Sequence, residues 1–403
     1  MSRDILFLAH RIPFPPDRGD KIRSWHMLKQ LGELGRVHLA CFADDDADAA
    51  HLPALREAMG GRLGEAFVEV RRSGKAVAAA RALLERRPVS LTAFDSLGLR
   101  RFVASLTSAR DIAAVFAFSG QMAQFVPPGP RFVMDFVDMD SAKFEAYAET
   151  GPAALRWLMR REAAMLFAFE RSTAARADAS LFVSEAEAAL FRARTGLAGV
   201  QAVSNGIDLD FFDPAAAFPR LGAAERGEGP MLLFTGQMDY RPNIEAATGF
   251  ARDVLPLLPG VRFAVAGRKP AAAVLALKEQ GVIVTGEVPD IRSWLAAADV
   301  VVAPLGIARG IQNKVLEAMA MAKAVVASPA AFEGIEAEPG LDLIVAATPQ
   351  EQARAIRRLI DEPATATAIG SSARRRMELC YRWDSRLGPL DQILFPAMRK
   401  AAA

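Results

Sequence analysis

Cysteine is scarce in this sequence, with only Cys41 and Cys380 among 403 residues. The two lie far apart, and neither belongs to a spacing typical of a metal site or a redox pair. The cysteine content therefore excludes a cysteine-based metal centre and fits a protein kept in a reducing compartment.

Long apolar runs are also missing. The first run, residues 5–9, ends at His10 and Arg11 and is too short for a signal peptide or a membrane span. No later run reaches spanning length. We therefore expect a cytoplasmic protein, or one attached from outside the bilayer at the inner face of the cytoplasmic membrane.

The chain has little excess of charge of either sign. Its 49 basic and 47 acidic residues give a formal net charge of +2, which does not favour nucleic acid as the main partner. With 403 residues the chain is long for one core, and its 52% hydrophobic content is enough for two domains of about 200 residues each.

Short apolar runs alternate with helix-like segments throughout the chain, which predicts an α/β fold. The first series of expected strands comprises residues 5–9, 37–42, 67–70, 113–118, 132–136, 179–183 and 200–203. The second comprises residues 231–234, 261–266, 282–284, 300–303, 324–327 and 343–346. Each series predicts a doubly wound parallel sheet, so we expect two Rossmann-like domains, at 1–207 and 208–380. The stretch 208–230 lacks periodicity and is the expected hinge.

The loop after strand 300–303 carries the strongest candidate site. A helix is expected to start near Gly310, which places Arg309 and Lys314 beside exposed backbone N–H groups that attract a phosphate. Glu317 follows three residues after Lys314, on the side away from the apolar stripe. Ligands of open α/β sheets bind outside the carboxyl ends of the strands. The alternative is an ordinary solvated ion pair on a helix surface.

Several segments resemble one known family. Lys-Val-Leu-Glu-Ala-Met-Ala at 314–320, followed by strand 324–327, resembles the donor-site signature of family-4 glycosyltransferases. Residues 204–208 with Phe212 and Pro214 are similar to the family's interdomain segment, and 234–238 with Asn243 to the opening of its second domain. Four segments, at 10–13, 19–23, 135–141 and 308–316, are similar to a bacterial subgroup of sugar transferases associated with exopolysaccharide and exosortase (PEP-CTERM) gene systems.

The resemblance implies a GT-B fold, in which two Rossmann-like domains face each other across a cleft. The first domain would bind the acceptor and the second the nucleotide-sugar donor, and a helix at 381–403 would cross back to the first domain. The implied activity is a retaining, metal-independent transfer of a sugar from a nucleotide-diphosphate sugar to a glycan or lipid-linked acceptor in exopolysaccharide biosynthesis. No cofactor is implied besides the donor substrate.

The sequence departs from the family pattern at the donor site. The family usually has two glutamates eight positions apart in this region. Glu317 matches the second, and Arg309 stands where the first would be. The family's usual arginine and lysine after the second-domain glycine are replaced here by Gln237 and Pro242. We expect Glu317 to keep the family role of holding the ribose hydroxyls, and Arg309 to act as a substitute phosphate clamp. The catalytic candidates are Lys314, Arg309 and Glu317. The donor-binding candidates are Gly236, Gln237, Arg241, Asn243, Gly267, Arg268, Asn313 and Glu317. Arg268 can equally be a solvated loop base.

The acceptor side is expected in the first domain, where His10 ends the first strand and Gly19 begins a helix. There Asp20 can cap the helix and Arg23 lies one turn inside it. The acceptor-side candidates are His10, Arg18, Gly19, Asp20, Arg23, Asp138 and Asp140. The alternatives are an ordinary capped turn, a buried structural imidazole and, for the two aspartates, capping of the helix expected from Ala142 onward.

Asp138-Met139-Asp140 is similar to the Asp-x-Asp metal motif of a different glycosyltransferase fold. We expect no metal here, because the resembled fold neutralises the leaving group with basic residues and helix ends. The segment 156–169 mixes bases with Trp and Phe; core packing is the favoured interpretation, and contact with anionic lipid is the alternative.

Two other functions stay open from sequence. A nucleotide-sugar epimerase on the same fold would act on the donor without an acceptor. The missing first glutamate also fits a degenerate transferase kept as a binding partner.

Overall fold

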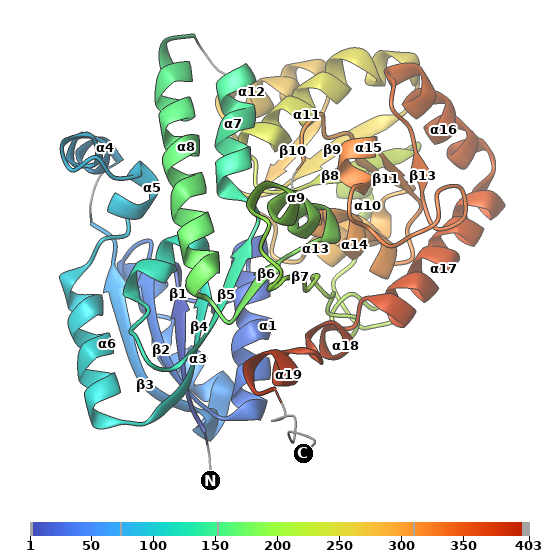
Figure 1. Cartoon of the computed structure of the whole chain (residues 1–403). Helices are drawn as coiled ribbons and strands as arrows, with labels where there is room; N and C mark the ends of the chain where they lie inside the picture. The colour runs from blue at the N-terminus through green and yellow to red at the C-terminus, as the bar shows by residue number, and fades with distance from the viewer. Residues whose placement is uncertain (1–2, 73–74, 151–152, 309–310, 397–403) are drawn as a thin grey trace. The chain divides into compact units, whose positions relative to one another are not determined.

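The computed structural model describes residues 3–72, 75–150, 153–308 and 311–396 (Figure 1). The chain divides into two compact units. Unit 1 contains Met1–Ser204 together with Leu387–Ala403, and unit 2 contains Asn205–Arg386. The fold is α/β in both units, as the alternation of apolar and helical segments predicts.

Unit 1 is built on a seven-stranded parallel sheet with the strand order β3-β2-β1-β4-β5-β6-β7. Its strands are β1 (Asp4–Ala9), β2 (Arg36–Ala43), β3 (Leu63–Val70), β4 (Ile112–Phe118), β5 (Arg131–Val137), β6 (Ala179–Phe182) and β7 (Val200–Ala202). The central strand β1 is apolar at successive positions, and Ile5, Leu6 and Phe7 are all fully buried. Apolar side chains on both faces of a strand require helices on both faces of the sheet.

The helices of unit 1 cover that sheet (Figure 1). They are α1 (Gly19–Leu34), α2 (Asp46–Ala49), α3 (Leu52–Met59), α4 (Lys75–Leu84), α5 (Val89–Thr92), α6 (Leu97–Ala109), α7 (Asp140–Thr150), α8 (Ala153–Arg176), α9 (Glu185–Thr195) and α19 (Leu390–Leu394), with 3-10 turns η1 (Gly60–Arg62) and η2 (Gly120–Phe125). Helices α7 and α8 pack side by side. Helix α19 is held in unit 1 by Arg131 of β5, which donates two hydrogen bonds to the carbonyl of Ile393.

Unit 2 contains a six-stranded parallel sheet with the order β10-β9-β8-β11-β12-β13. Its strands are β8 (Met231–Thr235), β9 (Arg262–Ala266), β10 (Ile283–Gly286), β11 (Val300–Ala303), β12 (Val325–Ala327) and β13 (Ile344–Val345). Its helices are α10 (Ala223–Arg226), α11 (Arg241–Asp253), α12 (Ala272–Leu275), α13 (Ile291–Ala297), α14 (Asn313–Ala320), α15 (Pro329–Phe332), α16 (Pro349–Asp361) and α17 (Pro363–Cys380), with 3-10 turns η3 (Leu255–Leu257) and η4 (Ala276–Gln280). Helix α18 (Trp383–Leu387) contains the boundary between the units.

The expected strands are all present, and each sheet is parallel throughout, so the prediction of two doubly wound sheets is confirmed. Strand ends differ by a few residues, most at β3, which begins at Leu63 rather than 67. The boundaries between the units also lie a few residues from the expected ones, after Ser204 and after Arg386.

The stretch 208–230, expected as the hinge, packs against unit 2 over much of its length. Leu209 and Phe212 are buried, and Arg374 donates to both of their carbonyls. Farther along, Ser293 donates to the carbonyl of Pro219. The stretch belongs to unit 2 and contains the short helix α10, and side chains from elsewhere in the unit hold the rest of it.

Helix α8 fulfils the core prediction for 156–169 only in part. Ala163 and Leu166 are buried, but Trp157, nearer the start, is 66% exposed. None of the helices in the described part of the chain has the length and apolar composition needed to cross a membrane.

Candidate active site

The strand order of unit 2 places two loops together at one edge of the sheet. Strands β8 and β11 are neighbours in the sheet, although β9 and β10 lie between them in the sequence, so the order of connection reverses between them. Loops that leave the carboxyl ends of two such strands diverge and leave room for a ligand. Here these loops are the one that starts at Gly236 and the one that starts at Pro304.

The loop after β11 leads into α14, which begins at Asn313 and not near Gly310. Lys314 is therefore the second residue of the helix, and the N-cap residue Gln312 does not cap the helix with its side chain. The helix is fixed by its apolar side, where Val315, Leu316 and Met319 are fully buried. Its N–H groups in the first turn are the type of donor that binds an anion. Arg309, the second expected cation, lies outside the described residues.

Lys314 is held by a side chain from the first turn of α11, the helix that follows β8. Its Nζ donates to Asn243 Oδ1 over 2.6 Å and lies 4.9 Å from the centre of the Phe234 ring. Asn243 in turn donates through Nδ2 to the carbonyl of Gln237 over 2.9 Å, and it is almost completely buried. Asn243 thus connects the cation of α14 to the loop after β8, which gives Lys314 one defined position.

Burial works against the charges of Lys314 and Glu317. It lowers the pKa of Lys314 to about 8, although the Glu317 carboxylate raises it. It raises the pKa of Glu317 to about 7, although Lys314 lowers it. Both side chains are only half-exposed, and Lys314 gives its hydrogen bond to Asn243. In a solvated surface ion pair, burial would not be the main influence on the pKa values of the two groups. The arrangement therefore favours a ligand site.

Two glycines bring the loops after β8 and β9 into direct contact. A Cβ on Gly267 would lie 1.6 Å from the carbonyl oxygen of Gly236, and a Cβ on Gly236 would lie 2.7 Å from Asn243 Nδ2. Both glycines have positive φ, 156° and 150°. The group that approaches Gly267 is therefore a backbone carbonyl, and the group that approaches Gly236 is the Asn243 side chain.

The other donor-side candidates differ in how they are placed. Asn313 accepts a hydrogen bond from Asn205 Nδ2 over 3.1 Å. Gln237 donates to Asp239, and Arg241 pairs with Glu245 over 2.6 Å on an exposed helix face. Arg268 is half-buried, and its carbonyl accepts from the N–H of Met238. Gln237 is connected to Lys314 through Asn243, and Asn313 directly precedes Lys314 in α14.

In unit 1, His10 and Asp20 lie together at the carboxyl end of β1. His10 Nε2 is 3.2 Å from Asp20 Oδ2, and Arg11 donates to the same carboxylate oxygen over 2.6 Å. Asp20 lies within α1 and does not cap it, because the N-cap position is Arg18. The His10 ring stacks on Phe118, and burial lowers its pKa. Gly19 is the first residue of α1 and is exposed.

The sequence interpretation missed a cluster around Asp44, which follows β2. Arg11, Arg18 and Arg71 all donate to this carboxylate, at 3.1, 2.8 and 2.8 Å. Burial raises the pKa of Asp44, but the hydrogen bond from Arg18 and the charges of Arg11 and Arg71 lower it to about 2. A usable signal was present, since Asp44 follows the carboxyl end of β2 and Arg71 that of β3, and these two strands are neighbours on one side of β1.

Arg23 lies in the interior of unit 1 and not at its surface. It is 1% exposed and forms a bidentate pair with the fully buried Asp135, at 3.0 and 3.2 Å. Burial raises the pKa of Asp135, and Arg23 opposes that rise. The pair connects α1 to β5, so any effect of Arg23 on an acceptor would pass through this connection.

Asp138 follows a strained turn at the end of β5. Val137 has a φ of 68°, which is unusual for a β-branched residue. Burial raises the pKa of Asp138 to about 7, with a further contribution from Glu187. Its Oδ1 is buried and has no hydrogen-bond partner among the described residues.

Asp140 is the first residue of α7, which therefore begins before Ala142, and it pairs with Lys143 at 3.8 Å. Within residues 3–72, 75–150, 153–308 and 311–396, no group of three His, Cys, Asp or Glu side chains converges as a metal site would require.

Solved structures with this architecture are glycosyltransferases of the GT-B fold. Sucrose-phosphate synthase (tll1590) from Thermosynechococcus elongatus is 17% identical, with a TM-score of 0.72 over 97% of this chain and 98% of that one. HepE (Alr3699) from Anabaena, in complex with UDP and glucose, is 16% identical, with a TM-score of 0.69 over 98% and 100%. WaaG, a glycosyltransferase involved in lipopolysaccharide biosynthesis, is 15% identical, with a TM-score of 0.67 over 96% and 99%. These likenesses establish the GT-B fold.

The sequence of unit 2 carries the more specific match. Residues 229–362 match the family model described as Glycosyl transferases group 1. The matched range includes Gly236, Asn243, Gly267, Lys314 and Glu317, so it covers the described donor-side site. Together with the GT-B fold, this match supports a transferase. No curated protein matches the sequence.

Proposed function

We propose that the protein is a retaining, metal-independent glycosyltransferase that moves a sugar from a nucleotide-diphosphate sugar to a glycan or lipid-linked acceptor. The observation that carries this proposal is the fixed position of Lys314, held by Asn243 at the start of α14 beside Gly236. A half-buried cation, a helix start and a glycine backbone at one sheet edge suit a diphosphate. The HepE structure is a complex with UDP and glucose, which fits a donor of this chemistry.

Each residue of the donor side has a role in this proposal. Lys314 neutralises the diphosphate as the departing oxygen gains charge, and the first N–H groups of α14 add the positive end of the helix dipole. Glu317, one turn along, accepts hydrogen bonds from the ribose hydroxyls. Arg309 acts as a second phosphate clamp in place of the glutamate that the family usually has there.

The retention of configuration comes from the family resemblance. In such a mechanism the departing phosphate accepts the proton of the attacking hydroxyl. The acceptor oxygen then bonds to the sugar on the same face from which the leaving group departs. Lys314 then has to stabilise a charge that develops mainly in the transition state, which is the most effective use of a fixed cation. The charge of the leaving group is handled by Lys314 and α14, so the proposal assigns no metal.

The acceptor would bind unit 1 at the carboxyl edge of its sheet. His10, Arg18, Gly19 and Asp20 gather there around β1, and Asp138 presents a buried carboxylate oxygen without a partner among the described residues. A sugar hydroxyl is a suitable donor to such an oxygen. The resemblance to the exopolysaccharide and exosortase subgroup supports a glycan or lipid-linked acceptor at the inner face of the cytoplasmic membrane.

The test is the turnover of a Lys314→Ala variant. Removal of one preorganised charge stabiliser should lower kcat by about 10²–10³. Initial rates of sugar transfer to an acceptor would be compared with those of Lys278→Ala, which removes an exposed lysine of the same unit. Full activity of Lys314→Ala would refute the role of Lys314 and with it the proposed site.

A donor incubated with the enzyme alone separates the proposal from the epimerase alternative. A transferase leaves the sugar of the donor unchanged or hydrolyses it slowly, whereas an epimerase changes the configuration of the sugar without any acceptor. Absence of any nucleoside diphosphate binding, measured by calorimetry, would contradict both enzymes and leave the degenerate binding partner.

A further inference from the structure

Strongly exposed apolar side chains gather on two helices of unit 1. Among the described residues, twelve large apolar side chains are strongly exposed, and five of them lie on α4 or in the first turns of α8. These five are Val77 (67% exposed), Leu83 (45%), Leu84 (85%), Leu155 (46%) and Trp157 (66%). Val77, Leu83, Leu84 and Trp157 define what we call the α4–α8 face, whereas Leu155, two residues before Trp157, points to the other side of α8. Single exposed apolar residues are common, but a group of four in two short segments marks an interaction surface.

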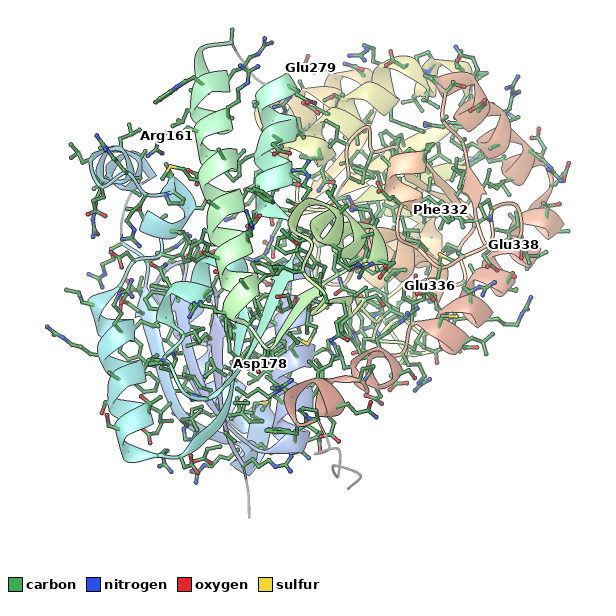
Figure 2. All side chains as sticks on the ribbon, in the orientation of Figure 1. Arg161, Asp178, Glu279, Phe332, Glu336 and Glu338 are labelled. Carbon is green, nitrogen blue, oxygen red and sulfur yellow. The ribbon has the colours of Figure 1, made fainter. Side chains whose placement is uncertain are left out.

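The two segments of the α4–α8 face are in contact. Arg161 of α8 donates to the carbonyl of Ala82 in α4 over 3.3 Å, and Figure 2 labels Arg161 on the upper part of α8. Glu162 accepts from the backbone N–H groups of Val89 and Ser90 in α5, both at 2.8 Å. Trp157 lies one turn before Arg161 and therefore on the same side of α8. These bonds fix the exposed apolar residues of both helices on one rigid part of unit 1.

The same two segments hold a large share of the positive charge of the chain. Residues 75–87 contain four Lys and Arg and one Glu, a net charge of +3, and residues 153–162 contain three Arg and one Glu, a net charge of +2. Their sum, +5, exceeds the formal charge of the whole chain, +2, so the remaining residues sum to −3. Asp95 pairs with Arg81 and Arg87, and the exposed Arg86 and Arg160 keep the face basic.

We propose that the α4–α8 face docks the protein on the surface of an anionic lipid bilayer. Trp and Leu side chains enter the boundary between headgroups and acyl chains, and the surrounding arginines contact anionic headgroups. A second copy of the chain is a poorer occupant, because two faces of like charge would meet. Docking adds a partner to the proposed function, since it would bring unit 1 to lipid-linked acceptors.

The test is flotation of the purified full chain with lipid vesicles, in the absence of any nucleotide sugar. Vesicles of phosphatidylcholine mixed with phosphatidylglycerol should carry the protein, and vesicles of phosphatidylcholine alone should carry at least about tenfold less at low salt. High salt should weaken the binding to the mixed vesicles, because it screens the arginines. As no donor is present, this result is independent of the outcome of the Lys314→Ala experiment.

Matched variants assign the binding to the face. Leu84→Ser and Trp157→Ser should each lower the partition to mixed vesicles by about tenfold or more, because each removes an inserted apolar side chain. The control is Leu379→Ser, which removes a side chain of similar exposure, 79%, from α17 in unit 2 and should leave the partition unchanged. Arg160→Gln should reduce binding to the mixed vesicles, and Lys278→Gln in η4 should not.

Three results would overturn the proposal. The first is equal flotation with neutral and anionic vesicles, and the second is equal loss of binding for Leu379→Ser and Leu84→Ser. The third is a dimer in sedimentation that Trp157→Ser dissociates, since a second copy would then occupy the face. Circular dichroism of each variant checks that its helices are intact, and because all five side chains are exposed, their replacement leaves the core of unit 1 unchanged.

Discussion

Lys314 carries its positive charge in a half-buried position, where desolvation disfavours the charged form. Burial lowers its pKa to about 8 and raises the pKa of Glu317 to about 7, so both side chains are pushed toward neutrality. Asn243 can accept one hydrogen bond from the ammonium group, but it carries no negative charge to neutralise it. A bound diphosphate would supply that charge, which explains why the site is arranged around a cation with a neutral partner.

The two pKa values predict a narrow pH optimum. Lys314 is a cation below its pKa of about 8, and Glu317 is a carboxylate above its pKa of about 7, so both are charged only between these values. The ratio kcat/KM should therefore fall below pH about 7 and above pH about 8, since this ratio reports groups of the free enzyme. The limbs belong to the coupled pair and are measured from initial rates at low donor concentration.

The variant Glu317→Gln assigns the two limbs. The acidic limb should disappear, and the alkaline limb should move to lower pH, because the Glu317 carboxylate is what raises the pKa of Lys314. Glu279→Gln, which changes an exposed acid of the same unit, should keep the profile of the unmodified protein. An unchanged acidic limb in Glu317→Gln would show that another group titrates there.

Sequence alone named Lys314, Glu317 and Asn243 as donor-side candidates but not the contact by which Asn243 positions Lys314. Lys314 and Glu317 lie three residues apart on one helix, a spacing that is visible in the sequence. The contact with Asn243 joins residues 71 positions apart and depends on the packing of two loops, which no local pattern reports. Asp44 illustrates the same limit, because its three arginine partners come from different parts of unit 1.

At the scale of elements, the strands β8 and β9 are coupled through glycine. The loop after β9 passes so close to the loop after β8 that a Cβ on Gly267 would overlap the carbonyl of Gly236. The two loops also exchange a hydrogen bond from the N–H of Met238 to the carbonyl of Arg268. The position of the β8 loop, and thus of Asn243 and Lys314, depends on this contact.

Gly267→Ala should therefore destabilise unit 2 by more than about 3 kcal/mol, because the added Cβ meets backbone that has little room to move. It should also weaken nucleotide binding, since the loop after β8, whose Gln237 carbonyl accepts from Asn243, must shift. The measurement is the urea midpoint together with calorimetric titration of a nucleoside diphosphate.

The control for this variant is Gly281→Ala. Gly281 also has a positive φ, 81°, but a Cβ there meets nothing within 4 Å. It should cost only about 1–2 kcal/mol, the strain of a left-handed conformation for alanine. Equal losses of stability in the two variants would mean that conformational strain, and not the contact with Gly236, limits residue 267.

The element pattern was the most predictable level of this fold. Buried parallel strands are continuous apolar runs, as in β1 and β11, and such runs can be recognised without knowledge of their neighbours. The start of α14 was placed too early, because the loop before it has no capping side chain to mark the boundary. The exposure of α4 and of Trp157 was not predictable, since an apolar residue in a helix is usually a core residue.

On the scale of the whole molecule, each unit has a buried apolar cluster of its own among the described residues. One cluster of buried residues surrounds β8 and β11 in unit 2, and another surrounds β1 and β4 in unit 1. Chains with more than one core commonly unfold in more than one step. The donor-side site lies in unit 2 alone, so a nucleotide has a direct effect on only one of the two cores.

Calorimetry of the full chain should therefore show two unfolding transitions, only one of which responds to a nucleoside diphosphate. A ligand at about 100 times its Kd stabilises the unit that binds it by about 2.7 kcal/mol. A panel of UDP, GDP and ADP would identify the base by the largest shift. The Lys314→Ala variant should keep both transitions but lose the shift, because it removes the diphosphate contact without altering either core. A single transition would instead mean that the two units unfold as one cooperative body, and a shift that survives in Lys314→Ala would place the nucleotide elsewhere.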